Sequence, residues 1–328
     1  MAILKFLGFG FVGAAVLLGG FFQYAQKEMD NFKIDYSQTP GKVILVTGAN
    51  SGLGYYTALE LAKHDAQVIL ACRSATRCQE AKQNILKEAP NGKVDALTLD
   101  LSSFQSIKDF VKEFESKYPA LDVLVNNAGI MALPNRETTK DGLEAQIGTN
   151  HFGHFLLTSL LYPLLTQNGR IINHSSSAHA FAAKNFVFKD LLSEQVYDPW
   201  VAYGNSKIAN LLFTYELNRR LEKAGNPKNI VSIALHPGYT ATNLQNSRFP
   251  FWEQINSLVA MKGHHGALSQ IYVAVDPSAK VSNNDYVGPA YVALGVPSVQ
   301  TTSSDAWDVD AQNKLWTESE RLTGVKFL

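Results

Sequence analysis

The stretch from Val43 to Gly54, which reads VILVTGANSGLG, decides the fold. Its first half is a β-branched, apolar run that predicts a buried strand, and helix-forming residues follow it up to Lys63. The glycines between them allow the backbone to turn tightly and to approach a pyrophosphate, whose charge a helix N-terminus stabilises. An ordinary strand-to-helix loop is the alternative, but the flanking strand and helix favour a dinucleotide site.

The same unit, an apolar run followed by a turn and a helical stretch, repeats along the chain after Pro40. This alternation predicts a parallel sheet covered by helices, that is, an α/β fold with a single doubly wound, Rossmann-type domain over residues 41–328. A body of this size fits one hydrophobic core, so no second domain is expected. The expected strands are Lys42–Thr47, Gln67–Cys72, Asp95–Leu99, Leu121–Asn126, Arg170–His174 and Ile230–His236, with a seventh near Tyr291–Leu294.

The amino terminus differs from the rest of the chain. From Phe6 to Phe22 the sequence contains no charged or polar side chain. A helix over this run and the few residues before it matches a hydrocarbon core of roughly 30 Å. Residues 1–25 are therefore expected to form an uncleaved membrane helix, and residues 26–40 a linker. A cleaved signal peptide and shallow insertion at a lipid surface are the alternatives.

Composition excludes several classes of function. Lys+Arg and Asp+Glu both number 29 and no long basic cluster is present, so nucleic acid is not an expected partner. The only cysteines, Cys72 and Cys78, are too few for a disulfide framework and lack zinc-ligand spacing. The body is therefore expected to fold on the reducing side of a membrane and to bind no metal. His264 and His265 are interpreted as a solvated turn, because adjacent histidines are poorly spaced for one ion.

The tip of the second predicted strand bears on the choice of cofactor. In a dinucleotide fold this tip contacts the adenosine ribose, and an acidic residue there would repel a 2′-phosphate. Here Arg73 follows the strand, and its guanidinium can form a charged fork with a 2′-phosphate. The sequence thus favours NADP over NAD. The alternative is that Arg73 caps a loop or stacks on the adenine.

Tyr203 and Lys207 are four residues apart, which places a phenol and an ammonium on one face of a helix. A Y-x-x-x-K pair alone is common. Taken with the glycine turn, with NNAG at 126–129 and with the serines at 175–176, it resembles the short-chain dehydrogenase/reductase family over roughly residues 42–242. The sequence NHFGHFLLT at 150–158 is further similar to the retinol dehydrogenase-like branch, many of whose members carry an N-terminal membrane segment.

The resemblance implies a catalytic tetrad. Tyr203 would be the general acid in carbonyl reduction and the base in alcohol oxidation, and Lys207 would favour the phenolate and hold the nicotinamide ribose. Ser176 would hydrogen-bond the substrate oxygen, with the serine on either side as the alternative. Asn150 would position a water that links Lys207 to solvent.

The resemblance also implies which residues contact NADP. They lie in the glycine turn, after the second, third and fourth strands, on the catalytic helix and in the PGYTAT segment at 237–242. These residues are Gly48, Ser51, Gly52, Leu53, Gly54, Arg73, Asp100, Asn127, Ala128, Tyr203, Lys207, Thr240 and Thr242. Some NADP-dependent members carry a basic residue where this chain has Ser51, so the choice of NADP rests on Arg73.

The expected function is that of a membrane-associated, NADP-dependent oxidoreductase for a lipophilic carbonyl/alcohol pair of retinoid, sterol, prenyl or fatty aldehyde type. An apolar stretch from Phe249 to Met261 resembles a substrate lid, although packing in the core or a dimer is an equal alternative. The expected location is the endoplasmic reticulum membrane or a lipid droplet, with the catalytic domain facing the cytosol and a homodimer expected by analogy alone. The alternative functions are a catalytically idle NADP(H)-binding redox sensor and a non-redox use of the fold.

Overall fold

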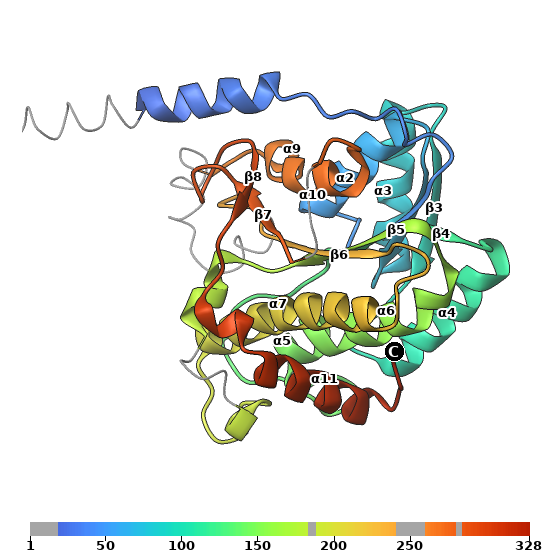
Figure 1. The fold of residues 1–328 in the computed structure, drawn as a ribbon. Helices are drawn as coiled ribbons and strands as arrows, with labels where there is room; N and C mark the ends of the chain where they lie inside the picture. Colours follow the sequence, from blue (N-terminus) through green and yellow to red (C-terminus); the bar gives the residue numbers. More distant parts are fainter. Residues whose placement is uncertain (1–18, 183–187, 241–259, 280–283) are drawn as a thin grey trace, which may run out of the picture.

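The computed structural model describes residues 19–182, 188–240, 260–279 and 284–328. Its centre is an eight-stranded sheet with the order β3-β2-β1-β4-β5-β6-β7-β8 (Figure 1). Seven strands run parallel and only β8 pairs antiparallel, with β7. The strands are β1 (Val43–Thr47), β2 (Gln67–Cys72), β3 (Lys93–Thr98), β4 (Leu121–Asn126), β5 (Leu165–His174), β6 (Val231–Leu235), β7 (Tyr286–Pro289) and β8 (Pro297–Gln300).

Helices cover both faces of the sheet, as the alternating sequence pattern predicts (Figure 1). One face carries α2 (Gly52–Lys63), α3 (Ala75–Glu88), α9 (Gly263–Gly266) and α10 (Leu268–Val275). The other face carries α4 (Phe104–Lys117), α5 (Ala145–Ile147), α6 (Gly153–Leu161), α7 (Pro199–Lys223) and α11 (Val309–Thr323). Ile44 and Val46 belong to the core on the first face, and Leu45 between them belongs to the core on the second. The two faces of β1 are thus both buried, as in a doubly wound fold.

Short helical segments complete the described chain. The π-helical η1 (Gly148–Phe152) joins α5 to α6, and the others are short 3-10 segments: η2 (Tyr162–Leu164), η3 (Ser177–Phe181), η4 (Phe188–Asp190) and η5 (Ser304–Trp307). Because β1 pairs with β2 on one side and β4 on the other, the strand order reverses there. Ligands of doubly wound sheets bind beyond the carboxyl ends of the strands at such a reversal.

The predicted seventh strand was wrong in position. Tyr291–Leu294 forms a turn, closed by a hydrogen bond from Tyr291 N to Leu294 O, and the strands lie on either side of it as β7 and β8. The sequence does not predict β7 because it contains Gly288 and Pro289, and glycine and proline are unusual within strands. Gly288 is required because a Cβ there would lie 1.9 Å from Nε2 of His236.

A helix over residues 19–31 precedes the sheet and lies above α9 and β8 in Figure 1. It buries Ala25 and Met29, and it continues into residues expected to be a linker. Most of the predicted membrane helix, residues 1–18, is outside the described residues. Among the helices that the structure does describe, none combines the length and apolarity needed to cross a membrane.

Candidate active site

The glycine turn connects β1 to α2, and its backbone has the conformation that lets a phosphate approach it closely. Gly48 and Gly52 have φ of +67° and +57°, in the left-handed region that favours glycine. A Cβ on Gly54 would lie 2.6 Å from Nδ2 of Asn127 and 2.7 Å from O of Gly48. Ser51 takes the N-cap position of α2 without a side-chain capping hydrogen bond. The N–H groups of the first turn therefore have no side-chain acceptor at the cap and could receive a phosphate.

Thr47 joins the carboxyl ends of β1 and β4, where the turn begins. Its Oγ1 accepts hydrogen bonds from N of Asn127 and N of Ala128, both at 2.9 Å, and its carbonyl accepts from Nδ2 of Asn127 at 2.7 Å. A Cβ on Gly48 would touch Ala128 at 3.0 Å. The structure thus brings together Asn127, Ala128 and the glycine turn, three parts of the predicted cofactor site.

Arg73 lies at the tip of β2 with an exposed side chain, and Ser74 caps α3 by accepting a hydrogen bond from N of Arg77. This geometry leaves the guanidinium of Arg73 open to a 2′-phosphate. Asp100, after β3, is already engaged: Oδ1 accepts from Oγ of Ser102 at 2.6 Å and Oδ2 pairs with Nζ of Lys140 at 2.9 Å.

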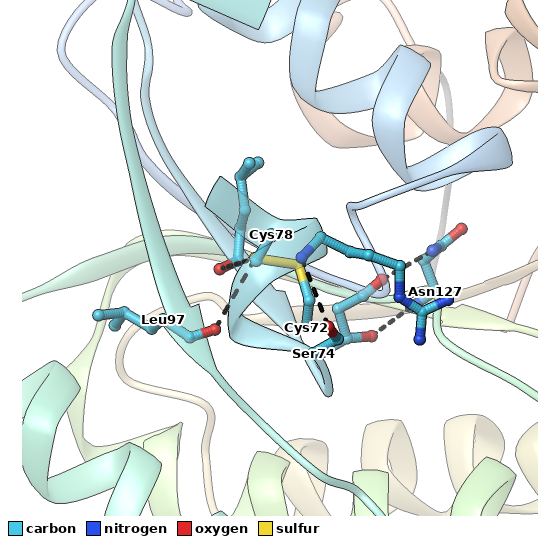
Figure 2. Close-up of a disulfide and its surroundings, with 8 residues drawn as sticks. Cys72, Ser74, Cys78, Leu97 and Asn127 are labelled. Carbon is cyan, nitrogen blue, oxygen red and sulfur yellow. Dashed lines mark hydrogen bonds between the residues drawn. A yellow bond between two sulfur atoms is a disulfide. The ribbon is translucent and has the colours of Figure 1, made fainter. Parts of the chain in front are cut away.

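The cysteines around Arg73 differ from expectation. Cys72 and Cys78 form a disulfide (Figure 2), which closes a loop over residues 73–77. They pair because Cys72 ends β2 and Cys78 lies on the first turn of α3, which folds back beside the strand. The small number of cysteines therefore does not support the inference of a reducing compartment. Two cysteines are too few for a disulfide framework, but they are enough for one disulfide when they are adjacent in space.

Tyr203 and Lys207 lie on α7, whose start is fixed by Pro199 and by Asp198, which accepts hydrogen bonds from N of Trp200 and N of Val201. Nζ of Lys207 is 5.4 Å from the ring centroid of Tyr203 and donates to O of His174. Burial raises the pKa of Tyr203 to about 12, although a hydrogen bond with Ser176 opposes the shift. Burial also lowers the pKa of Lys207 to about 8.

The three consecutive serines, Ser175 to Ser177, make different contacts in the structure. Ser176 is the serine whose side chain acts on the Tyr203 hydroxyl and lowers its pKa, whereas Oγ of Ser175 donates to O of Lys207 at 2.8 Å. Ser177 begins the short helix η3. The geometry therefore places Ser176, as expected, beside the phenol.

Asn150 lies in the π-helical segment η1, a distortion that is frequent at functional sites. Its Oδ1 accepts from N of Ile130, and its Nδ2 donates to Oγ of Ser206 at 2.9 Å. Its carbonyl oxygen accepts from Nδ1 of His154 at 3.0 Å. This main-chain oxygen is the expected acceptor for a water between Asn150 and Lys207, and a carbonyl can accept two hydrogen bonds.

Two histidines, His154 and His179, support the site, although the sequence assigned no role to either. His154 donates from Nδ1 to Asn150, so its bare Nε2 accepts from Oγ1 of Thr47 at 3.0 Å. Burial lowers the pKa of His154 to about 4 and keeps it neutral. His179 donates from Nδ1 to O of Ser176 at 2.6 Å, and its Nε2 accepts from N of Ser303 at 3.2 Å. Thr47 and Ser303 are more than 100 residues away from these histidines, so no spacing in the sequence could reveal those two contacts.

The substrate side is described in part. Thr240 is buried and its Oγ1 donates to O of Pro237 at 2.9 Å. Thr242 and the predicted lid from Phe249, up to residue 259, lie outside the described residues. Met261 at the end of that stretch is fully buried, which fits packing in the core.

The expected solvated turn at His264 and His265 is only half right, because His264 is exposed and His265 is not. His265 is buried, and its Nε2 donates to Oδ1 of Asp30 at 2.8 Å, which ties α9 to the N-terminal helix. Ligand atoms of Asp30, His264 and His265 lie within 4.8 Å of one another, so the adjacent positions of the two histidines do not keep their ring nitrogens apart.

Comparisons with known proteins agree with this geometry. The model of a family described as short chain dehydrogenase matches residues 42–188. Retinol dehydrogenase 13 of Mus musculus is 40% identical, covering 87% of this chain and 85% of the relative. Polyprenol dehydrogenase of Homo sapiens is 34% identical, covering 96% and 94%. The crystal structure of an uncharacterised protein from Mycobacterium paratuberculosis superposes with a TM-score of 0.73 at 36% identity, covering 89% of this chain and 98% of that one.

Proposed function

This chain belongs to the short-chain dehydrogenase/reductase family, and from that premise we propose that it is a membrane-associated, NADP-dependent enzyme that reduces a lipophilic carbonyl. The family uses a nicotinamide cofactor to interconvert alcohol and carbonyl groups. The observation that carries the proposal is the convergence of the Tyr203 hydroxyl, Ser176 and Lys207 at the edge of the sheet where the glycine turn lies.

The cofactor fits the residues present. A Cβ on Gly48 or Gly54 would meet Ala128, Asn127 or the backbone of the turn itself, so glycine lets the turn pack tightly against the end of β4. Arg73 offers a cation for a 2′-phosphate. When bound, the nicotinamide supplies or accepts the hydride. Asn127 and Ala128 would line the middle of the site, and Lys207, together with Thr240, its nicotinamide end.

The chain's own residues handle the proton. Ser176 would hold the substrate oxygen by a hydrogen bond and stabilise the negative charge that develops on it. The phenol of Tyr203 would donate its proton to that oxygen in reduction. The ammonium of Lys207 would stabilise the phenolate that remains, and a water on the Asn150 carbonyl would return a proton from solvent.

The lipophilic substrate and the membrane are supported by the relatives and by the N-terminal sequence. The relatives are named for retinol and polyprenol, both long apolar alcohols. The charge-free run from Phe6 to Phe22 would hold the enzyme where such molecules dissolve, in the endoplasmic reticulum membrane or on a lipid droplet. A homodimer remains part of the proposal by analogy with the family.

The test is NADPH oxidation by the full chain in phospholipid nanodiscs, with long-chain aldehydes and ketones as substrates. Tyr203→Phe should lower kcat by about 10²–10⁴-fold and weaken NADPH binding far less, because it removes the proton donor but only one of many expected cofactor contacts. Tyr162→Phe, which removes a hydroxyl far from the site, is the matched control. Cofactor binding without turnover of any carbonyl would favour the idle redox sensor.

The proposal that the catalytic domain faces the cytosol can be tested separately. In a reducing compartment the Cys72–Cys78 pair would be present as thiols, and Cys78 Sγ lies 3.4 Å from O of Leu70, which a thiol could use as an acceptor. Intact cells are therefore treated with an alkylating reagent, then lysed and denatured in the same reagent without a reductant. Mass spectrometry should find both cysteines alkylated. A pair that remains oxidised would place the domain in an oxidising lumen instead.

A further inference from the structure

Four exposed side chains gather where the N-terminal helix meets the turn between β7 and β8. They are Phe21 and Tyr24 on the helix and Tyr291 and Val292 on the turn, with 40%, 55%, 40% and 57% of their surfaces exposed. The ring centroids of Phe21 and Tyr291 are 4.9 Å apart, so the helix and the turn form one continuous surface. We call these four residues the aromatic patch.

Glu28 orients the two tyrosines of the aromatic patch. The hydroxyl of Tyr24 donates to Oε1 of Glu28 at 2.9 Å, and that of Tyr291 donates to Oε2 at 3.0 Å. Both polar ends are thus held back on the protein, and the rings are what remains exposed. An apolar ring with a satisfied polar end suits the boundary between acyl chains and headgroups, where tyrosine is enriched.

Val292 supplies an independent observation. Its φ is +64°, in the left-handed region that glycine and asparagine adopt readily and that is a genuine outlier for a β-branched residue. More than half of its surface is exposed, so packing within the described chain does not offset this strain. An apolar side chain kept at a strained, exposed tip is explained by a contact outside the chain.

The sequence beside the patch indicates what that contact is. The run from Phe6 to Phe22 contains no charge and leads directly into the helix that carries Phe21 and Tyr24. Eighteen residues of chain, 1–18, lie outside the described structure and end at the patch. An apolar segment that arrives at an exposed aromatic surface fits a lipid bilayer better than a soluble partner.

The patch is also joined to the substrate side of the site. The carbonyl of Ala293, next to Val292, accepts a hydrogen bond from N of Tyr239 at 2.7 Å, and O of Tyr239 accepts from N of Met261 at 2.9 Å. Thr240, a predicted cofactor contact, follows directly. The turn that carries the patch therefore supports the backbone that borders the nicotinamide end.

We propose that the aromatic patch rests in the interface of a neutral phospholipid bilayer and holds the substrate side of the site against it. A lipophilic carbonyl then reaches Tyr203 from the membrane without crossing water. The substrate route rests on the proposed function, whereas the bilayer contact does not require catalysis.

The first test measures depth in the membrane. Val292→Cys in the full chain, carrying a nitroxide label, is compared with Val309→Cys at the start of α11, on the opposite face of the sheet (Figure 1). Cys72 and Cys78 are each only 1% exposed, so labelling of the folded protein modifies the new residue. In phosphatidylcholine nanodiscs, power saturation should show the label at 292 favouring oxygen over a water-soluble nickel complex, and the label at 309 the reverse. Equal access of the nickel complex to both overturns the bilayer contact and leaves a protein partner or none.

The second test measures the substrate route. Val292→Asn tolerates the left-handed backbone and removes the apolar side chain, and Val309→Asn is its control. We expect the KM for an aldehyde dissolved in the nanodisc to rise about fivefold, with kcat and the KM for a short water-soluble aldehyde unchanged. Equal changes for both aldehydes overturn the route. If the unmodified enzyme reduces neither aldehyde, the proposed function fails while the depth measurement still decides the contact.

Discussion

Lys207 shows what burial does to a single catalytic side chain. Its pKa is lowered to about 8 because its ammonium is buried, while burial raises the pKa of Tyr203 to about 12. In the free enzyme the lysine therefore loses its charge as the pH rises through about 8, and the phenol stays protonated well above that pH. Deprotonation of the lysine, rather than of the tyrosine, is thus the first change of charge in the site as the pH rises.

This order predicts the alkaline limb of the pH profile. For carbonyl reduction, kcat/KM for NADPH, which reports groups of the free enzyme, should fall above about pH 8 with the slope of one proton. Lys207→Arg retains a positive charge at every accessible pH, because the guanidinium pKa exceeds about 12. Its residual activity should lack that limb. An unchanged limb in the variant would assign the titration to another group.

Arg73 determines a second prediction at this scale. Arg73→Ala should weaken NADPH binding about 10- to 100-fold, the loss of a charge-assisted fork, and leave NADH binding unchanged. Arg77→Ala removes a neighbouring exposed charge from α3 and should affect neither cofactor. Fluorescence titration of both cofactors measures the ratio. Equal weakening for NADPH and NADH would mean that Arg73 stacks on the adenine or supports the loop.

Among the elements, the β1–α2 unit was the most predictable from the sequence. Strand, glycine turn and helix are local features, and the residues at each position have one physical reason to be there. The same holds for β2, β4 and the catalytic helix, whose spacing places Tyr203 and Lys207 on one face. The contacts of His154 with Thr47 and of His179 with Ser303 join distant segments, so only the packed fold reveals them. The turn at Tyr291–Leu294 was mistaken for a strand because an apolar run does not report the sign of φ.

The glycine turn gives the prediction at the element scale. Gly54→Ala would place a Cβ 2.6 Å from Nδ2 of Asn127 and 2.7 Å from O of Gly48, so either the turn or the Asn127 side chain must shift. We expect NADPH affinity to fall by at least about tenfold and the free energy of unfolding by about 1–3 kcal/mol. Gly20→Ala, where a Cβ would meet nothing within 4 Å, is the control. Unchanged affinity in Gly54→Ala would separate the turn from the cofactor site.

At the scale of the whole molecule, the two ends of the described chain close opposite faces of the sheet. The N-terminal helix is fixed on one face by Asp30 and His265. On the other face, Phe327 is buried against Trp316 and Phe155, with ring centroids 5.0 and 5.9 Å apart. Phe155 belongs to α6, which continues directly from the π-helical segment of Asn150. The carboxyl terminus thus packs behind the catalytic helix pair.

This closure predicts that the next-to-last residue is essential to the core. Phe327→Ala should lower the free energy of unfolding by about 3–5 kcal/mol, because it leaves a cavity among aromatic rings. Leu328→Ala, one residue further and 46% exposed, should change it by less than about 0.5 kcal/mol. Urea unfolding of the full-length variants in the same detergent, followed by tryptophan fluorescence, measures both. Below the transition, kcat of Phe327→Ala should stay near that of the unmodified enzyme, since the ring touches neither Tyr203 nor Lys207. Equal stabilities of the two variants would show that the carboxyl terminus is not docked on α6 in solution.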